Sequence, residues 1–527
     1  LDGNLAASGG DTQLDANGHL SMAQASASSA INVKAESFDA QGAVYAGTRL
    51  EVQTVTGLSN QKSLAARDSL ALSSGGQLTN NGIIEAGVSA DNTRTKTGDI
   101  SLSSATLKNT NSVVASRGLT VTTAQTLDNQ AGTLSGLKIQ VTADQFDNRR
   151  GRVLSTDTLM INAARLDNRA NGLLHSNNNA DISVLTALDN QSGRVMSLKD
   201  LRLNAGHLSN QSGEVSATQT RVTASTLDNR SGKLFGSNLV VTASDALINH
   251  RGLVIAEGAL TLSAASVDNS QEGVISSKAD TYAELGHLDN RSSGKLSSDG
   301  LLVIKANQIE SGAGHISAKG GIHATVGVFN QQGGELVSEG ALTLKSVTLD
   351  NRNAGLITAD KGVDLHSQTV LNQQGEISSQ AKVLLTADRL NNQEGKVISG
   401  DSLQLRVASA LDNSLKGVLS AQRVLQIEAA RLDNQMGGSL ASHGALAITA
   451  GDVDNRGGVI GSQQVLNLIT ANLENSAGLI SSQDDLTLLG QRVDSSFGGE
   501  VSAKGDMRLT VQQLIQRQGR LIGERAV

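Results

Sequence analysis

The chain has 527 residues, of which 38% are hydrophobic and 1% aromatic, with a net charge of −7 and neither proline nor cysteine. The lack of cysteine excludes disulfides and thiolate metal sites, and an acidic chain without a basic block argues against nucleic acid as a partner. Average usage would give about 26 prolines, and since proline cannot donate to a β ladder, its absence predicts a backbone that lies almost entirely in or near β-sheet.

The first 57 residues carry an altered form of a three-residue phrase, Leu-Asp-Asn, that recurs through the rest of the chain. Ala16 and Ala40 stand where later copies have asparagine, and residues 25–30 contain only alanine and serine. We therefore predict irregular coils over residues 1–57 and regular coils of the same kind over residues 58–527.

An insertion is expected near residues 89–98. The spacing from Asn80 to Asn109 is 29 residues, about nine more than the usual interval, and the surplus falls in this polar run. We predict a loop that leaves the coil, either as a tolerated surface insertion or as a binding loop.

From residue 129 onward the asparagine of the phrase returns at a nearly constant interval. The 346 residues from Asn129 to Asn475 contain 17 steps, so the mean period is about 20.4 residues, with Ser311 and later Ser495 interrupting the series. The asparagines are Asn129, Asn148, Asn168, Asn190, Asn210, Asn229, Asn249, Asn269, Asn290, Asn330, Asn351, Asn372, Asn392, Asn413, Asn434, Asn455 and Asn475. Such a fixed period indicates a stacked solenoid in which each repeat contacts its neighbours.

Within one coil the apolar residues alternate with period two, which is typical of β-strands. After Gly375 the patterns Ile-x-Ser, Leu-x-Leu-x-Ala and Leu-x-Asn follow one another, and they predict three short strands joined by tight corners. The same period directs the leucine and asparagine of the phrase inward and the aspartate outward. Stacked asparagines then form a ladder, in which each amide donates to the next carbonyl.

A glycine that follows the asparagine marks a corner, and we expect it to supply the positive φ of a sharp turn. The representative corner glycines are Gly132, Gly151, Gly193, Gly213, Gly232 and Gly375. Since crossovers between parallel strands are right-handed, the fold predicted is an all-β, right-handed parallel β-helix of roughly 26 coils.

The outward aspartates need a compensating partner, because neighbouring strands lie about 4.8 Å apart. Three interpretations are open: hydrogen bonds to the corner backbone, pairing with the arginine that follows the asparagine, and a divalent cation along the stack. The arginines are Arg149, Arg169, Arg230, Arg291, Arg352 and Arg456. Separately, Ile248, Phe329 and Leu371 are apolar residues at the outward position and are candidates for a contact surface.

Catalysis is not expected. A β-helical polysaccharide-degrading enzyme needs clustered carboxylates in a cleft, whereas the acids here are spread at about one per coil. The nine histidines form no ligand pair, and the glycine-rich calcium nonapeptide is missing. We predict no catalytic, metal-binding or cofactor-binding residues and no cofactor.

The phrase Leu-Asp-Asn-(Gln/Arg)-x-Gly, followed by Leu-x-Leu-x-Ala, resembles the repeats of filamentous haemagglutinins. Residues 127–132 and 432–437 are representative, and the similarity spans about residues 58–524. Similar repeats build the stalks of CdiA-type effectors of contact-dependent growth inhibition.

The resemblance implies export through an outer-membrane transporter of a two-partner secretion system and a fibre outside a Gram-negative cell. In a CdiA-type effector the stalk projects receptor-binding and toxin regions, so a target-cell receptor would bind outside these repeats. The alternative is the shaft of a haemagglutinin-like adhesin for cell or biofilm attachment. No apolar run is long enough for a transmembrane helix. Since both ends fall within partial repeats, we expect a fragment of a longer protein.

Overall fold

A computed structural model describes residues 4–527 and shows β-strands, with no helix among those residues. Residues 1–3, the start of the predicted irregular region, lie outside the described residues. The chain divides into two compact units, unit 1 from Leu1–Gly258 and unit 2 from Ala259–Val527. None of the described residues forms a helix long and apolar enough to cross a membrane.

In unit 1 short and long strands alternate over part of the chain. The four-residue strands are β1 (Asn4–Ala7), β2 (Thr12–Asp15), β3 (His19–Met22), β4 (Gln24–Ala27), β6 (Ala43–Ala46), β8 (Ser63–Ala66), β10 (Ile83–Ala86), β12 (Ser112–Ala115), β16 (Leu173–Ser176), β18 (Arg194–Ser197) and β22 (Leu253–Ala256). The longer strands are β5 (Ile31–Ala40), β7 (Arg49–Asn60), β9 (Ser69–Asn80), β11 (Asp99–Asn109), β13 (Gly118–Asp128), β14 (Thr133–Asp147), β15 (Arg152–Asp167), β17 (Asn179–Asp189), β19 (Asp200–Ser209), β20 (Glu214–Asp228) and β21 (Lys233–Ile248).

Unit 2 repeats the alternation. Its four-residue strands are β24 (Val274–Ser277), β26 (Lys295–Ser298), β28 (His315–Ala318), β30 (Glu335–Ser338), β32 (Leu356–Ala359), β34 (Glu376–Ser379), β36 (Lys396–Ser399), β38 (Val418–Ala421), β40 (Ser439–Ser442), β42 (Val459–Ser462), β44 (Leu479–Ser482), β46 (Glu500–Ala503) and β48 (Arg520–Gly523). Its longer strands are β23 (Leu260–Asp268), β25 (Thr281–Asp289), β27 (Leu301–Glu310), β29 (Gly321–Asn330), β31 (Leu342–Asp350), β33 (Val363–Leu371), β35 (Val383–Asn391), β37 (Ser402–Asp412), β39 (Val424–Asp433), β41 (Ala445–Asp454), β43 (Leu466–Glu474), β45 (Leu486–Asp494) and β47 (Met507–Ile515).

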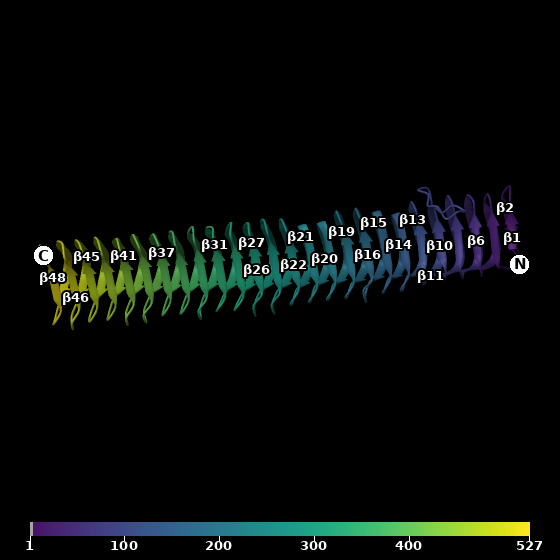
Figure 1. Ribbon diagram of the computed structural model, residues 1–527. Coiled ribbons are helices and arrows are strands. Elements are labelled where there is room, and N and C mark those ends of the chain that lie inside the picture. Colours follow the sequence, from purple (N-terminus) through teal and green to yellow (C-terminus); the bar gives the residue numbers. More distant parts are fainter. Residues whose placement is uncertain (1–3) are drawn as a thin grey trace. The chain divides into compact units, whose positions relative to one another are not determined.

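Within each unit a strand pairs in parallel with its equivalent in the next coil (Figure 1). Ile377 of β34 lies opposite Val397 of β36, and Leu385 of β35 lies opposite Leu405 of β37. The predicted fold class is confirmed: the chain forms a parallel β-solenoid of about 26 turns with roughly 20-residue coils. The right-handed sense stays a prediction.

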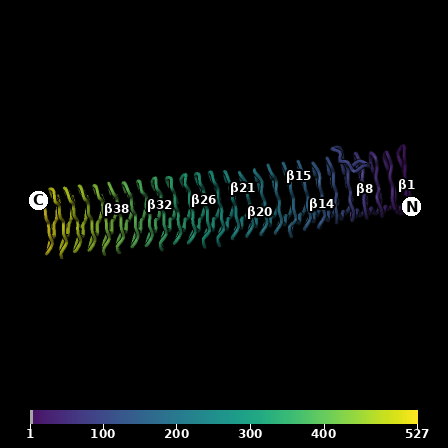
Figure 2. The backbone as a smooth tube through the Cα atoms, viewed as in Figure 1, coloured from purple at the N-terminus to yellow at the C-terminus, as the bar shows by residue number. Residues whose placement is uncertain are grey.

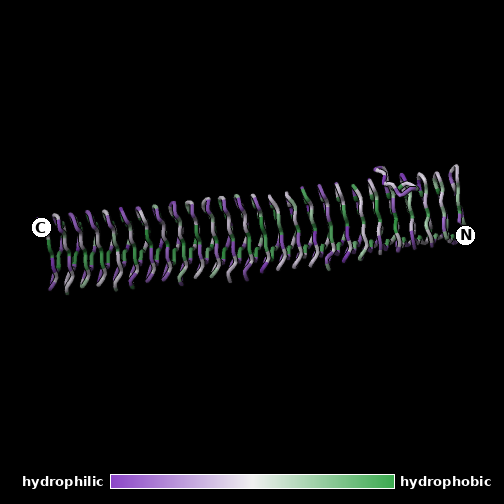
Figure 3. Tube along the Cα trace, viewed as in Figure 1, coloured by the Kyte–Doolittle hydropathy of each residue, from purple (hydrophilic) through white to green (hydrophobic). Residues whose placement is uncertain are grey.

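The core of each coil is a thin layer of aliphatic side chains. In β34 and β35 the residues Ile377, Val383, Leu385 and Leu390 have no exposed surface, and their neighbours in sequence point outward. Figure 3 shows apolar and polar segments alternating along the coils. Because the apolar period is two, a slip of one residue would expose the whole layer, and the register is strongly specified.

The first described coil has the three separate strands that the sequence predicts, namely β1, β2 and β3, whereas later coils have fewer. The Leu-x-Leu-x-Ala segment and the first two residues of Leu-x-Asn form one continuous strand, β35, whose pairing with β37 shifts register between Ala387 and Arg389. The prediction of a break at this corner is wrong here, because a β-bulge bends the strand without ending its pairing.

A segment between β10 and β11 leaves the outline of the coils in unit 1 (Figure 2). Val88 and Arg94 form an antiparallel bridge. Arg94 also makes an ion pair with Glu85, whose side chain is only 16% exposed. The excursion therefore folds back onto the coil from which it leaves.

Candidate functional site

A column of buried asparagines runs through unit 1. From Asn60 to Asn229, each Nδ2 donates to the Oδ1 of the asparagine in the next coil at 2.7–2.8 Å, and no residue of the column has exposed surface. The column comprises Asn60, Asn80, Asn109, Asn129, Asn148, Asn168, Asn190, Asn210, Asn229 and Asn249. These nine amides all donate toward the C-terminal end of unit 1, so the ladder has a single direction.

Unit 2 has the same arrangement with two serines in it. Asn269 donates to Asn290 at 2.8 Å. A second series begins at Asn351 and continues at 2.7–2.8 Å through Asn372, Asn392, Asn413, Asn434, Asn455 and Asn475. Ser311 and Ser495 accept from Asn290 and Asn475 at 3.3 and 3.1 Å.

The ladder amides also stabilise the corner backbone. Asn392 Nδ2 donates to the carbonyl oxygens of Gly395 and Val418, both at 3.2 Å, as well as to Asn413 Oδ1. Its backbone N–H donates to Asp412 O at 2.7 Å, and its carbonyl accepts from Gly395 N–H at 3.0 Å. Buried polar groups are costly unless paired, and here one side chain satisfies the backbone of two coils.

The prediction that Asn330 belongs to the ladder is wrong. Asn330 occupies the aspartate position, since it lies opposite Glu310 and Asp350, and it donates to Glu310 Oε2 at 2.8 Å. Gln331 fills the ladder position without exposed surface. Phe329, which we expected to be outward, is buried at the leucine position, so it contributes nothing to a contact surface.

Sequence reasoning left three further members out of the ladder. Asn60, Asn80 and Asn109 were not assigned to it, although each is buried and bonded within the column. Their signal was available in Leu58 and Leu78, which stand two residues before Asn60 and Asn80 in the usual pattern.

The corner glycines are required for a different reason from the one expected. The left-handed residue is the one before each glycine, with φ of 52–60°: Ala131, Arg150, Ser192, Ser212, Ser231 and Gln374. A Cβ at Gly132, Gly151, Gly193, Gly213, Gly232 or Gly375 would lie 2.6–2.8 Å from the ladder Oδ1 of the same coil, and closer still to the asparagine carbonyl of the coil before. The expectation of positive φ is wrong for these glycines. They are required because the backbone carbonyl of the coil before, together with the ladder amide, leaves no room for a side chain.

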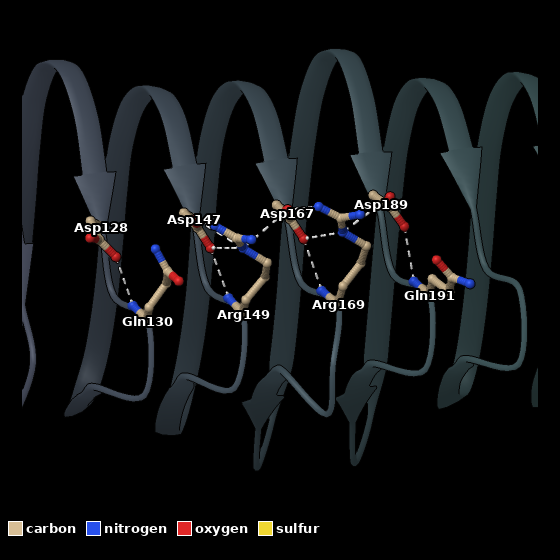
Figure 4. A network of polar contacts seen from close by, with 8 residues as sticks. All are labelled: Asp128, Gln130, Asp147, Arg149, Asp167, Arg169, Asp189 and Gln191. Atoms are coloured by element: carbon tan, nitrogen blue, oxygen red, sulfur yellow. Dashed lines mark hydrogen bonds and ion pairs between the residues drawn. The ribbon is translucent and has the colours of Figure 1, made fainter.

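The outward aspartates use two of the three proposed kinds of partner at once (Figure 4). Asp147 Oδ1 accepts the backbone N–H of Arg149 at 3.1 Å, and the guanidinium of Arg149 donates to both of its oxygens at 2.6–3.1 Å. Arg149 Nε also lies 3.5 Å from Asp167 Oδ2 in the next coil. Arg169 repeats this with Asp167 and Asp189.

Four further arginines pair in the same way with the aspartate two residues earlier. They are Arg230, Arg291, Arg352 and Arg456. Where no arginine follows, the backbone bond remains, as between Gln130 N–H and Asp128 Oδ1 at 3.0 Å. The row of carboxylates is thus compensated coil by coil.

Hydrogen bonding shifts the ionisation of these pairs. The guanidinium of Arg291 and, after it, its backbone N–H hold the pKa of Asp289 below the usual value, although burial acts in the opposite direction. Since the pKa is lower in the folded chain, the stabilisation is present above the unfolded value of about 3.9. It is lost as the pH falls through the folded pKa.

We expect Asp289→Asn to reduce the acid sensitivity of the chain. The amide keeps the acceptor for Arg291 N–H but cannot be protonated, so the loss of unfolding free energy between pH 7 and pH 2 should be smaller than in the parent. Urea unfolding at several pH values measures this. Asp388→Asn, at an exposed residue without an ion pair in the described chain, serves as the control. Equal changes in both variants would contradict the prediction.

No metal centre is assembled in the described chain. Among residues 4–527, no group of three or more His, Cys, Asp or Glu side chains is arranged to hold a metal ion. His207 bonds Thr226 in the next coil and His315 bonds Glu335 at 2.9 Å, so these histidines serve the packing of adjacent coils.

Comparison with known proteins agrees with this geometry. The family model of the haemagglutinin repeat matches at residues 2–82, 86–160, 155–250, 219–292, 279–346, 346–414, 407–490 and 467–524. The chain belongs to the haemagglutinin repeat family. No curated protein and no solved structure matches it. The repeats and the β-helical shaft fit a filamentous haemagglutinin-like adhesin or stalk.

Proposed function

We propose that the chain is the extracellular stalk of a two-partner-secreted exoprotein of the CdiA type and has no catalytic role of its own. Its task is to hold receptor-binding and toxin regions, which lie outside the chain, away from the producing cell. An outer-membrane transporter would export it, and a receptor on the target cell would be its distal partner. The shaft of a haemagglutinin-like adhesin is the alternative.

The observation that carries this proposal is the uniformity of the coils. The same buried column and the same paired aspartates recur from coil to coil in each unit. Such repetition gives every coil the same mechanical role, whereas a catalytic site needs a few coils to differ sharply from the rest. Family membership supports a structural role.

Deleting single coils in register tests the stalk. Removing residues 373–392 joins Asn372 to Gln393, and removing residues 191–210 joins Asn190 to Gln211, so both deletions keep the phrase intact. If the coils act as a spacer, both deletions should change contact between producer and target cells equally, and longer deletions should act in proportion. A loss confined to one deletion would indicate a local binding surface and would overturn the proposal.

The same strains separate the two kinds of exoprotein. Death of neighbouring cells that lack a protective partner gene identifies a growth-inhibition effector. Attachment to cells or to a biofilm without inhibition identifies an adhesin. The experiment should use the full exoprotein, including any receptor-binding and toxin regions, because the repeats alone fit both roles.

We expect Leu385→Pro to lower the amount of exoprotein at the cell surface. Leu385 is fully buried in β35, and proline there removes a ladder donor and costs about 3 kcal/mol or more. If coils that fold outside the cell help to draw the chain out, secretion should fall. Immunodetection on intact cells measures it, with Leu385→Val as the control. Unchanged secretion of the proline variant would contradict the coupling of folding to export.

A further inference from the structure

The asparagine ladder of unit 2 is interrupted at two successive interfaces between coils. Ser311 and Gln331 take the ladder position in neighbouring coils, and both are fully buried. Gln331 Oε1 and the buried Asn351 Oδ1 accept no hydrogen bond from residues 4–527. The ladder bond is therefore missing from Ser311 to Gln331 and again from Gln331 to Asn351.

The bond that leads into this region is also long. Asn290 Nδ2 lies 3.3 Å from Ser311 Oγ, whereas successive asparagines from Asn351 to Asn475 are bonded at 2.7–2.8 Å. The amide of Gln331 donates to the corner carbonyl of the next coil and not to the ladder. Because a buried acceptor without a donor costs free energy, these interfaces resist separation less than the regular ones.

The same region is rich in glycine. Residues 311–340 contain eight of the 56 glycines of the chain, about two and a half times the average density. Glycine loses more conformational entropy on folding than any other residue, so ordering this segment costs more than ordering a regular coil. The missing ladder bonds and the glycines thus weaken the same coils.

The apolar core and the outward row continue across the region. Phe329 is buried in line with Ile309 and Leu349, and the parallel pairing of these strands has no register shift. Asn330 donates to Glu310 Oε2 at 2.8 Å. The defect is confined to the buried polar column, so the coils stay stacked in the native state and only the free energy needed to separate them falls.

We propose that the interfaces Ser311–Gln331 and Gln331–Asn351 are the point at which unit 2 opens first. Each repeat of a solenoid contacts its neighbours alone, so the weakest interface determines where the stack separates. Native proteins open locally, in units that differ in stability, and the coils on either side remain folded when these interfaces open. In the proposed stalk this would let the shaft yield at a defined place under load; that consequence rests on the proposed function, whereas the opening itself does not.

Unit 2 also contains a regular stretch with corners of the same lengths. In both stretches a glycine follows the four successive ladder residues by four, three, three and four positions. The ladder residues are Asn290, Ser311, Gln331 and Asn351 in the first stretch, and Asn351, Asn372, Asn392 and Asn413 in the second. The second stretch is therefore an internal control for the first.

Hydrogen exchange of the full chain under native conditions, followed by mass spectrometry, tests the opening. The rates are corrected for the intrinsic exchange of each sequence. Peptides from residues 311–340 should exchange about tenfold faster than those from residues 372–401, the ratio expected for one or two unpaired buried groups. Equal protection of the two segments would overturn the proposal.

Restoring the ladder identifies the cause. A double variant, Ser311→Asn with Gln331→Asn, replaces both interruptions by the residue that the matched corners carry. Its exchange at residues 311–340 should slow until most of the difference from residues 372–401 is lost. If these residues exchange as fast as in the parent, the missing bonds do not determine where unit 2 opens, and the proposal fails.

Moving the defect gives the converse test. Asn372→Ser with Asn392→Gln places the same two residues at the matched corners of the regular stretch. Residues 372–401 should then exchange about tenfold faster than in the parent, while residues 311–340 are unchanged. Unaltered exchange at residues 372–401 would contradict the proposal, and the restored variant decides alone if this one does not fold.

Discussion

Replacing Asn392 by aspartate should destabilise unit 2 by about 3–5 kcal/mol at pH 7, the loss expected for an uncompensated buried charge. The exchange is isosteric, so packing is unchanged. The Asn392 amide donates to Asn413 Oδ1, Gly395 O and Val418 O, and a carboxylate would face these three acceptors with no proton. Urea unfolding of the full chain, followed by circular dichroism, measures the loss.

The pH dependence identifies the cause. Burial raises the pKa of the new carboxyl above its unfolded value of about 3.9. The deficit is therefore complete above the folded pKa and shrinks as the pH falls through it, since the protonated acid can donate to Asn413 again. The gap between variant and parent should narrow on acidification, and a gap independent of pH would contradict this explanation.

The adjacent residue is a matched control. Asn391 occupies the outward position that other coils give to aspartate, and its Oδ1 accepts from Gln393 N–H at 3.1 Å. Asn391→Asp makes the same chemical change one residue away and should alter stability by no more than about 0.5 kcal/mol. Similar losses of stability in the two variants would contradict the explanation, because they would mean that the inward position of Asn392 does not cause the loss.

Much of this fold follows from periodicity alone. A period of two within the coil determines which side chains enter the core, and a period near twenty places equivalent residues on top of one another. The inward asparagine of most coils could therefore be assigned from the sequence pattern alone. The sequence fails at Asn330 because Val328-Phe329-Asn330 satisfies the same pattern one residue early, and both Gly333 and Gly334 satisfy the glycine spacing.

Contacts with the neighbouring coils determine which residue of this coil takes the inward position. Gly333 takes the left-handed turn position with φ of 64°, and Gly334 takes the crowded position beside Ser311 O. Phe329 then fills the core in line with Ile309 and Leu349. Such choices depend on contacts between coils, which a linear pattern does not contain.

The same limit explains the corner glycines. A glycine at a turn suggests a backbone conformation with positive φ. The lack of space for a Cβ atom depends on the neighbouring coil, which the sequence pattern does not show. Gly375 lies beside Asn372 Oδ1 and Asn351 Nδ2, at 2.8 and 2.9 Å from where a Cβ would stand, and still closer to Asn351 O. Its requirement therefore comes from the close approach of the neighbouring coil, first of its backbone carbonyl and then of the ladder amides. The left-handed conformation belongs to Gln374 before it.

We accordingly expect Gly375→Ala to destabilise unit 2 by about 3 kcal/mol, at the upper end of the cost of overpacking, because the atoms that it meets are backbone and a bonded amide. Gly461→Ala is the control, since its nearest neighbour would be Ser481 Oγ at 3.6 Å. There the exchange should be neutral or stabilising by up to about 1 kcal/mol. Denaturant unfolding of the three proteins compares them.

Gln374→Gly distinguishes the two explanations for the corner. Gln374 is exposed with φ of 60°, and a left-handed conformation costs an ordinary residue about 1 kcal/mol. Glycine should therefore stabilise at 374 while alanine destabilises at 375, one residue apart. If Gly375→Ala were tolerated and Gln374→Gly were harmful, crowding of position 375 by the neighbouring coil would not be the constraint at this corner. Contacts between neighbouring coils would then not determine the backbone conformation at the corner.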